Sequence, residues 1–177
     1  MGLFDKKAVR QEIRAKIAKL SEEEKREISE RLCRHIAKME AIESSRTVAL
    51  FISLHDEPQT TVLLEKLHDK QVVVPRIEGD EMEFYDISEG LEKGAFGIME
   101  PTATTPIKPS KIDVMIVPGV VFTREGARCG RGKGFYDKYL SQPAFRAATV
   151  GICFKEQIAD SLPADSHDKR VDAVIFA

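Results

Sequence analysis

The sequence is poor in cysteine, in net charge and in long apolar stretches, and each shortage excludes a class of protein. Its three cysteines, Cys33, Cys129 and Cys153, are odd in number and far apart in the chain. Their spacing fits neither a zinc site nor a disulfide framework, so we expect reduced thiols and a cytoplasmic protein. The formal net charge is −2, whereas general nucleic-acid binding usually needs a basic excess, so we expect no nucleic-acid partner.

No segment is apolar over the length that crosses a membrane, and the N-terminus matches neither a signal peptide nor a myristoylation pattern. We therefore expect no membrane partner. With 42% hydrophobic and 32% charged residues, the composition is that of an ordinary globular protein. Neither an internal repeat nor a domain boundary is visible, so residues 1–177 are expected to form a single domain.

Helical periodicity alternates with strand patterns along the chain. Apolar residues recur at helical spacing in residues 5–20, and the sequence from Ser21 to Glu24 is a capping box that starts a second helix. Further helices are expected at residues 60–69 and from Phe135 to Ser141. Apolar runs typical of strands in a parallel sheet occupy residues 47–53, 72–75, 113–117, 148–154 and 171–176.

Two weaker segments complete the pattern. Residues 82–87 alternate as an edge or hairpin strand, whereas residues 89–109 are rich in Gly, Pro and Thr and are expected to be mainly loop. The repeated alternation of strand and helix predicts a three-layer α/β/α domain, in which a mostly parallel sheet carries helices on both faces.

The most informative segment follows the expected strand at residues 113–117. It breaks at Pro118-Gly119, alternates glycine with cations, and ends in two aromatic residues and a carboxylate: Gly130-Arg131-Gly132-Lys133-Gly134-Phe135-Tyr136-Asp137. Glycines let backbone amides approach a ligand closely. Arginine and lysine donors, which here include Arg128, suit phosphate, and a carboxylate suits Mg²⁺. The loop thus has the parts for a nucleotide, a planar ligand and a metal.

This segment is neither of the two common nucleotide motifs. A P-loop would need Gly in place of Ala127 and Ser or Thr after Lys133, and a dinucleotide fingerprint would need Gly in place of Phe135. A plain structural loop with solvated cations is the alternative, although the aromatic residues and Asp137 argue against it. For Cys129 we favour a small side chain packed beneath the loop over a reactive thiol.

Residues 117–140 resemble the signature of the 5-formyltetrahydrofolate cyclo-ligase family, also called 5,10-methenyltetrahydrofolate synthetases. The likeness continues in the right order through Lys6-Lys7-Ala8-Val9-Arg10, residues 51–57, Val73-Val74-Pro75-Arg76, residues 96–101 and residues 151–172. Phe135 stands where Tyr is usual, Ala127 and Cys129 replace a frequent Asn and Leu, and residues 55–58 are an unusual form of the substrate-binding strand end.

The resemblance implies a fold like the sugar-isomerase and CoA-transferase sheets, and an activity. ATP would drive closure of 5-formyltetrahydrofolate to 5,10-methenyltetrahydrofolate and yield ADP and phosphate. Transfer of the γ-phosphoryl to the formyl oxygen would create a good leaving group, N10 would attack the activated carbon, and phosphate would depart. Such chemistry needs positioning and charge neutralisation more than a covalent nucleophile, and cations, backbone amides and Mg²⁺ would supply them. We expect the protein to be a monomer or a weak homodimer.

The resemblance also assigns roles to residues. ATP would be bound by Lys6, Arg10, Arg128, Gly130, Arg131, Gly132, Lys133, Gly134, Phe135 and Tyr136. Arg131 or Lys133 would stabilise charge on the transferring phosphoryl oxygens, and so both are candidate catalytic residues. Mg²⁺ would be bound by Asp137 and Asp172. The folate would be bound by Glu57, Ile52, Phe96 and Tyr136, with Glu57 holding the pterin amino and ring N–H groups.

Each role has a plainer alternative. The cations of the N-terminal helix, Lys6, Arg10 and Arg14, would otherwise be a solvated basic face. Asp137 alone suits the start of a helix, and Ile52 and Phe96 suit a core. At the level of function, the alternatives are another ATP-dependent phosphotransferase with a different acceptor, and a non-catalytic protein that sequesters a folate or nucleotide.

Overall fold

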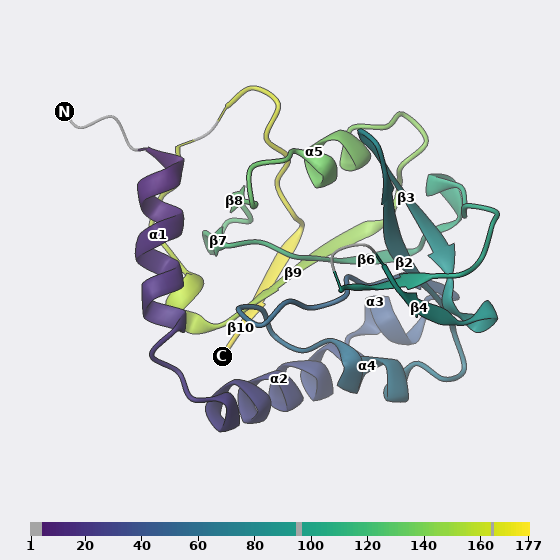
Figure 1. Cartoon of the computed structure of the whole chain (residues 1–177), viewed down its shortest axis with the longest axis horizontal. Helices are drawn as coiled ribbons and strands as arrows, with labels where there is room; N and C mark the ends of the chain where they lie inside the picture. The colour runs from purple at the N-terminus through teal and green to yellow at the C-terminus, as the bar shows by residue number, and fades with distance from the viewer. Residues whose placement is uncertain (1–4, 95–96, 164) are drawn as a thin grey trace.

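The computed structural model describes residues 5–94, 97–163 and 165–177, which form a central sheet covered by helices (Figure 1). The sheet has six strands in the order β10-β9-β6-β1-β2-β3. They are β1 (Thr47–Ala49), β2 (Gln71–Glu78), β3 (Glu81–Asp86), β6 (Val114–Val117), β9 (Ala148–Cys153) and β10 (Ala173–Phe176). Neighbouring strands run parallel except β3, which pairs antiparallel with β2 at one edge.

The strand order contains a switch point beside β1. The chain passes from β1 to β2 on one side and later returns to place β6 on the other side of β1. Loops that leave the carboxyl ends of β1 and β6 therefore diverge from adjacent points on the same sheet edge. In open α/β sheets, ligands commonly bind in the crevice at such a point.

Five helices accompany the sheet in the described residues: α1 (Lys6–Ile17), α2 (Glu22–Ala37), α3 (Glu40–Glu43), α4 (Thr61–Lys66) and α5 (Phe135–Leu140). Asp5 caps α1 by accepting a hydrogen bond from the Lys7 amide at 2.9 Å. The predicted capping box is confirmed, because Ser21 Oγ accepts from the Glu24 amide and the Glu24 carboxylate accepts from the Ser21 amide. None of these helices is long and apolar enough to cross a membrane.

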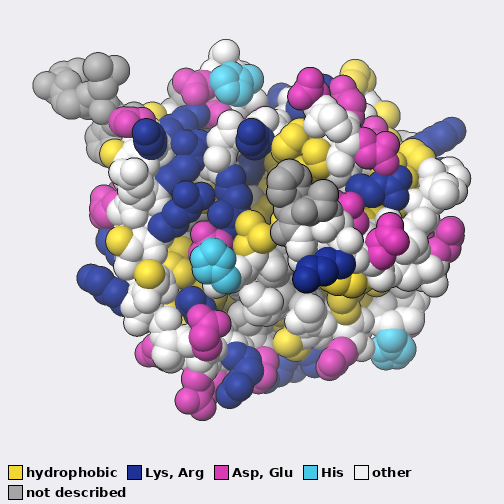
Figure 2. All heavy atoms as spheres, in the orientation of Figure 1, with side chains coloured by type: hydrophobic (Ala, Val, Ile, Leu, Met, Phe, Trp, Pro, Cys, Tyr) yellow, Lys and Arg dark blue, Asp and Glu magenta, His cyan; other side chains and the backbone are white. Residues whose placement is uncertain are grey.

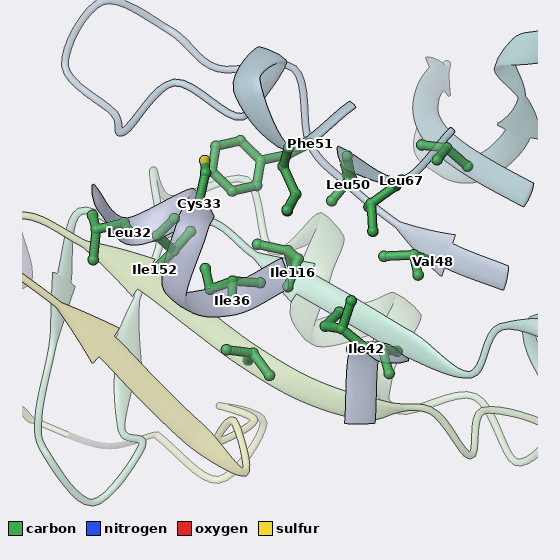
Figure 3. Packing of buried hydrophobic residues seen from close by; sticks show 14 of the residues in the cluster. Leu32, Cys33, Ile36, Ile42, Val48, Leu50, Phe51, Leu67, Ile116 and Ile152 are labelled. Atoms are coloured by element: carbon green, nitrogen blue, oxygen red, sulfur yellow. The ribbon is translucent and has the colours of Figure 1, made fainter. Parts of the chain in front are cut away.

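Side chains of the central strands alternate between two hydrophobic clusters, one on each face of the sheet. Val48, Leu50, Ile116 and Ile152 lie on the face that α2 and α3 cover, as the close view in Figure 3 shows. On the opposite face, buried side chains of the sheet pack with Tyr139 of α5. These sheet residues are Ala49, Val73, Phe84, Met115 and Val117. The three-layer α/β arrangement predicted from the sequence is thus confirmed. A third cluster joins α1 to β7 (Val121–Phe122).

Tertiary pairing moves several of the predicted boundaries. The run at residues 47–53 pairs as a strand only to Ala49, and Leu50 adds one more bond by donating its amide to the Val73 carbonyl at 2.9 Å. β2 is twice the predicted length because it forms a hairpin with β3. Residues 89–109, predicted to be mainly loop, contain the small hairpin of β4 (Leu91–Lys93) and β5 (Met99–Pro101).

Candidate active site

The glycine-rich loop lies between a short hairpin and α5. After β6 the chain turns at Pro118-Gly119 and forms the hairpin of β7 and β8 (Arg128–Cys129), which sequence patterns did not predict. Gln157 holds the turn, because its buried amide nitrogen donates to the carbonyls of Gly119 at 2.9 Å and Val120 at 3.1 Å. A Cβ at Gly119 would lie 2.7 Å from the Phe122 ring, so close packing requires glycine there.

Within the loop, two glycines adopt backbone conformations that other residues rarely reach. Gly132 has φ +103° and Gly134, which precedes α5, has φ +72°. A Cβ at Gly132 would also lie 3.6 Å from Arg10 Nη2. The loop therefore depends on glycine for its shape and lies directly against the cation of α1.

The two predicted phosphate-binding cations of α1 both contact segments that lie more than 100 positions away in the sequence. Arg10 Nε donates to the Gly130 carbonyl at 2.7 Å. Lys6 Nζ pairs with Asp165 at 2.6 Å and Asp168 at 2.7 Å. Burial alone would lower the pKa of Lys6, but the hydrogen bonds that Lys6 donates to these carboxylates, together with their charge, outweigh burial and raise it. Figure 2 shows Lys and Arg side chains gathered on this part of the surface, over α1 and the neighbouring loops.

Arg128 and Asp137 form a buried ion pair at the base of the loop. Arg128 Nη2 donates to Asp137 Oδ1 at 2.9 Å, and the two side chains are 3% and 17% exposed. The Lys169 amide donates to the same oxygen at 3.0 Å. Arg128 also lies 5.7 Å from the Tyr136 ring centroid. Arg128 therefore neutralises Asp137 and anchors the loop, and it is less accessible to a phosphate than its sequence position suggests.

Arg131 reaches across the switch point to the segment that follows β1. Its Nε and Nη2 donate to Glu57 Oε1 at 3.1 and 2.8 Å, and its Nη1 donates to Asp56 Oδ2 at 3.2 Å. Burial alone would raise the pKa of Asp56, yet the hydrogen bonds and charge of Arg131 lower it. The structure thus brings together the predicted phosphate loop and the predicted folate carboxylate, because β1 and β6 are neighbours.

Tyr136 lies between these groups. Its hydroxyl is buried without a hydrogen-bond partner among the described residues, and burial, together with the charge of Glu57, raises its pKa. Its ring meets Phe84 edge to face, with centroids 6.4 Å apart. Phe135 packs against the same hydrophobic cluster. The ring of Tyr136 is therefore packed in the protein, while its hydroxyl can still form a hydrogen bond with a ligand or with water.

The remaining predicted residues lie apart from these contacts. Lys133 is exposed and makes no hydrogen bond or ion pair within the described part of the chain. Ile52 packs on the α2 side of the sheet and lines a small hollow of about 50 Å³. Phe96 lies outside the described residues. A larger open hollow, of about 550 Å³, lies among Arg46, Gln71 and Lys111 at the amino ends of the strands.

The two predicted metal ligands occupy different surroundings. Asp172 Oδ2 accepts from the Thr149 amide at 2.8 Å and the Thr149 hydroxyl at 2.9 Å, where β9 and β10 begin. Both bonds to Asp137 use Oδ1. Each carboxylate therefore keeps one oxygen that accepts no hydrogen bond from the described residues. Asp137 and Asp172 share no hydrogen-bond partner among the residues that the structure describes.

Sequence reasoning gave no role to two acidic groups. Asp56 pairs with Arg131 and lies 3.7 Å from Arg14 Nε, and Asp168 binds Lys6 and the Asp165 amide. Because Asp56 is adjacent to Glu57, which was expected to lie near a loop of cations, the sequence could have indicated that Asp56 also pairs with one of these cations. For Asp168 no local pattern existed, because its partner lies 162 positions away. Cys129 is buried as expected, and burial raises the pKa of its thiol.

The fold places this chain among α/β proteins with a mostly parallel sheet, and the candidate site lies at the carboxyl ends of β1 and β6, where ligands commonly bind in such folds. Comparison with known proteins identifies the family within this class of α/β proteins. A model of the 5-formyltetrahydrofolate cyclo-ligase family matches residues 4–177. The chain therefore belongs to this family of ligases, as its sequence motifs indicated.

Individual relatives agree over almost the whole chain. The 5-formyltetrahydrofolate cyclo-ligase of Mus musculus is 28% identical, over 97% of this chain and 93% of its own length. The solution structure of Aquifex aeolicus 5,10-methenyltetrahydrofolate synthetase is 35% identical, with a TM-score of 0.87, and covers 97% of this chain and 89% of that one. The Mycoplasma pneumoniae synthetase gives 28% identity and a TM-score of 0.80, over 97% and 98% of the two chains.

Proposed function

We propose that this chain, acting as one domain, catalyses the ATP-dependent closure of 5-formyltetrahydrofolate to 5,10-methenyltetrahydrofolate. One observation carries the proposal: Arg131 of the glycine-rich loop contacts Glu57, the carboxylate expected to bind the pterin. A reaction that transfers a phosphoryl group from one ligand to another needs their sites to adjoin. Here the two predicted sites meet at the switch point of the sheet.

The reaction balances without a protein nucleophile. The formyl oxygen on N5 accepts the γ-phosphoryl of ATP as ADP departs, N10 attacks the formyl carbon and loses its proton to solvent, and the oxygen leaves as part of inorganic phosphate. Lys6, Arg10, Lys133 and the amides of the glycine loop would hold the phosphates, and Arg131 would donate to the oxygens that gain charge. Arg128 would act mainly by holding Asp137 in place.

The residues also suit a magnesium ion. Asp137 and Asp172 each keep a carboxylate oxygen without a hydrogen bond in the described structure, and Mg²⁺ prefers such hard oxygen ligands, directly or through water. Bound Mg²⁺ would neutralise charge on the phosphates. We propose that Asp137 binds the ion and that Asp172, whose other oxygen is held by Thr149, acts through water.

Glu57 provides a residue-level prediction. In Glu57→Gln, one carboxylate acceptor for the pterin N–H groups becomes a donor, so the KM for the folate should rise about tenfold or more, while the KM for ATP changes less. Steady-state kinetics with each substrate varied in turn measures both constants. Equal effects on the two constants would show that Glu57 does not recognise the folate.

The activity itself is tested by mixing purified protein with 5-formyltetrahydrofolate and Mg-ATP and following the near-UV absorbance of the methenyl product. Product that requires ATP supports the proposal. Binding of both ligands without product would instead indicate a sequestering protein or another acceptor. We further propose that the protein works in the cytoplasm, a location that suits its three buried, unpaired cysteines.

A further inference from the structure

The Arg131 guanidinium is shared between two adjacent carboxylates and uses a different edge for each. The edge formed by Nη1 and Nη2 faces both oxygens of Asp56, in the fork geometry of strong arginine–carboxylate pairs. The edge formed by Nε and Nη2 faces a single oxygen of Glu57, at 3.1 and 2.8 Å. Both carboxylates are largely buried, with side chains 11% and 7% exposed, whereas the Arg131 side chain is 31% exposed.

The two carboxylates are not equivalent as ligands. Glu57 Oε2 accepts the Leu54 amide at 2.9 Å, while Oε1 accepts both bonds from Arg131. A carboxylate oxygen has two lone pairs, so Oε1 is already saturated. A folate that binds Glu57 through two N–H groups must therefore displace the Nε–Nη2 edge of Arg131. Asp56, by contrast, directs both oxygens toward cations of the described residues, Arg131 and Arg14.

We propose that Asp56 is a positioning residue, which keeps Arg131 at the reaction centre after the folate has taken over Glu57. The proposal rests on the proposed function. In this structure Arg131 has two anchors, Asp56 and Glu57, and folate binding would remove one of them. The edge released from Glu57 becomes free to donate to the transferring phosphoryl oxygens, while the Asp56 fork fixes the orientation of the guanidinium. Folate binding thereby frees one edge of Arg131 to donate to the phosphoryl group of ATP.

The test compares Asp56→Asn with wild type in steady-state kinetics. Loss of the fork should lower kcat about 10- to 100-fold, as expected when a catalytic group is misplaced, and leave the folate KM within about threefold. Asp56→Glu, which keeps the charge, should recover part of kcat. Asp69→Asn is the matched control, because Asp69 is exposed just beyond α4 and forms no hydrogen bond or ion pair with described residues.

A double variant separates positioning from a direct role. If Asp56 acts through Arg131, the Arg131→Ala/Asp56→Asn protein should be no slower than Arg131→Ala alone. Hydrogen exchange of the ligand-free protein gives a readout that needs no activity. The amides of residues 130–134 should exchange faster in Asp56→Asn than in wild type or in Asp69→Asn, because the loop loses an anchor.

The outcomes distinguish this role from the reaction itself. A wild-type protein that forms no methenyl product overturns the proposed function. Product from wild type, together with an Asp56→Asn variant whose kcat is within twofold, overturns only the role of Asp56. So does an additive double variant, or loop exchange that is unchanged in Asp56→Asn.

Discussion

Removal of the Asp137 carboxylate should destabilise the fold as well as impair Mg-ATP use. Asp137→Ala takes away the acceptor that faces Arg128 Nη2 at 2.9 Å, and the Arg128 side chain is only 3% exposed. The guanidinium would keep one long hydrogen bond, from Nη1 to the Pro118 carbonyl at 3.3 Å. Arg128 Nε already lacks a hydrogen-bond partner within the described part of the chain. A buried positive charge would thus remain without an anion.

Breaking a buried ion pair from one side typically costs about 3–5 kcal/mol, because the remaining charge is buried and uncompensated. In a domain of this size, each kcal/mol lowers Tm by roughly 2–4 °C, so we expect a fall of at least about 6 °C. Urea denaturation followed by circular dichroism, without ATP or metal, measures the free energy of unfolding. The fall should appear there, since it does not depend on ligands.

Two further variants test whether the loss of stability in Asp137→Ala comes from the unpaired charge of Arg128. Asp137→Asn keeps an oxygen acceptor for Arg128 and should lose less stability than Asp137→Ala, although it also loses a charged Mg²⁺ ligand. The double variant Arg128→Met/Asp137→Ala removes both charges and should be more stable than Asp137→Ala alone. If Asp137→Ala unfolds within about 1 kcal/mol of wild type, the ion pair does not anchor the loop as the structure indicates.

Three other substitutions test separate features. Lys133→Ala should lower kcat about 100-fold with little change in Tm, because the side chain is exposed and binds no described residue; a kcat near wild type would remove Lys133 from the catalytic set. Gly126→Ala should cost more stability than Gly79→Ala in urea titrations. Both glycines have positive φ (+87° and +62°), but a Cβ at Gly126 would overlap a buried carbonyl oxygen, whereas one at Gly79 meets nothing; equal losses would contradict this. Hydrogen bonds from the backbone amides of Thr47 and Arg46 lower the pKa of Asp113 below its ordinary value of 3.8. The stability that Asp113 contributes is therefore present above about pH 4 and is lost as the pH falls through the lowered pKa, so Asp113→Asn should flatten the acid side of the stability–pH curve.

The central strands of the sheet could be predicted from the sequence because they are apolar on both faces. Val114–Val117, for example, is buried at every position, and Pro118-Gly119 ends the run. The hairpin of β7 and β8 could not be predicted. Each strand spans two residues, and their pairing depends on tertiary contacts, such as the bond between the Ala159 amide and the Phe122 carbonyl.

The residues of the candidate site were easier to predict from the sequence than the contacts that these residues make with one another. Glycine and cations in alternation already indicate an anion-binding loop, so Arg131 and Lys133 could be named from sequence. Sequence does not say which cation meets solvent and which meets a carboxylate. Arg128 and Arg131 differ by three positions, yet one is buried on Asp137 and the other bridges to β1. That difference arises from the packing of the loop across the switch point.

The measurement that tests the account most directly follows the formyl oxygen. 5-Formyltetrahydrofolate labelled with ¹⁸O in the formyl group is incubated with the protein and Mg-ATP, and the inorganic phosphate is examined by mass spectrometry. Phosphorylation of the formyl oxygen predicts one ¹⁸O in each phosphate released with the methenyl product. Unlabelled phosphate, formed in step with that product, would show that ATP hydrolysis proceeds by another route and would contradict the account.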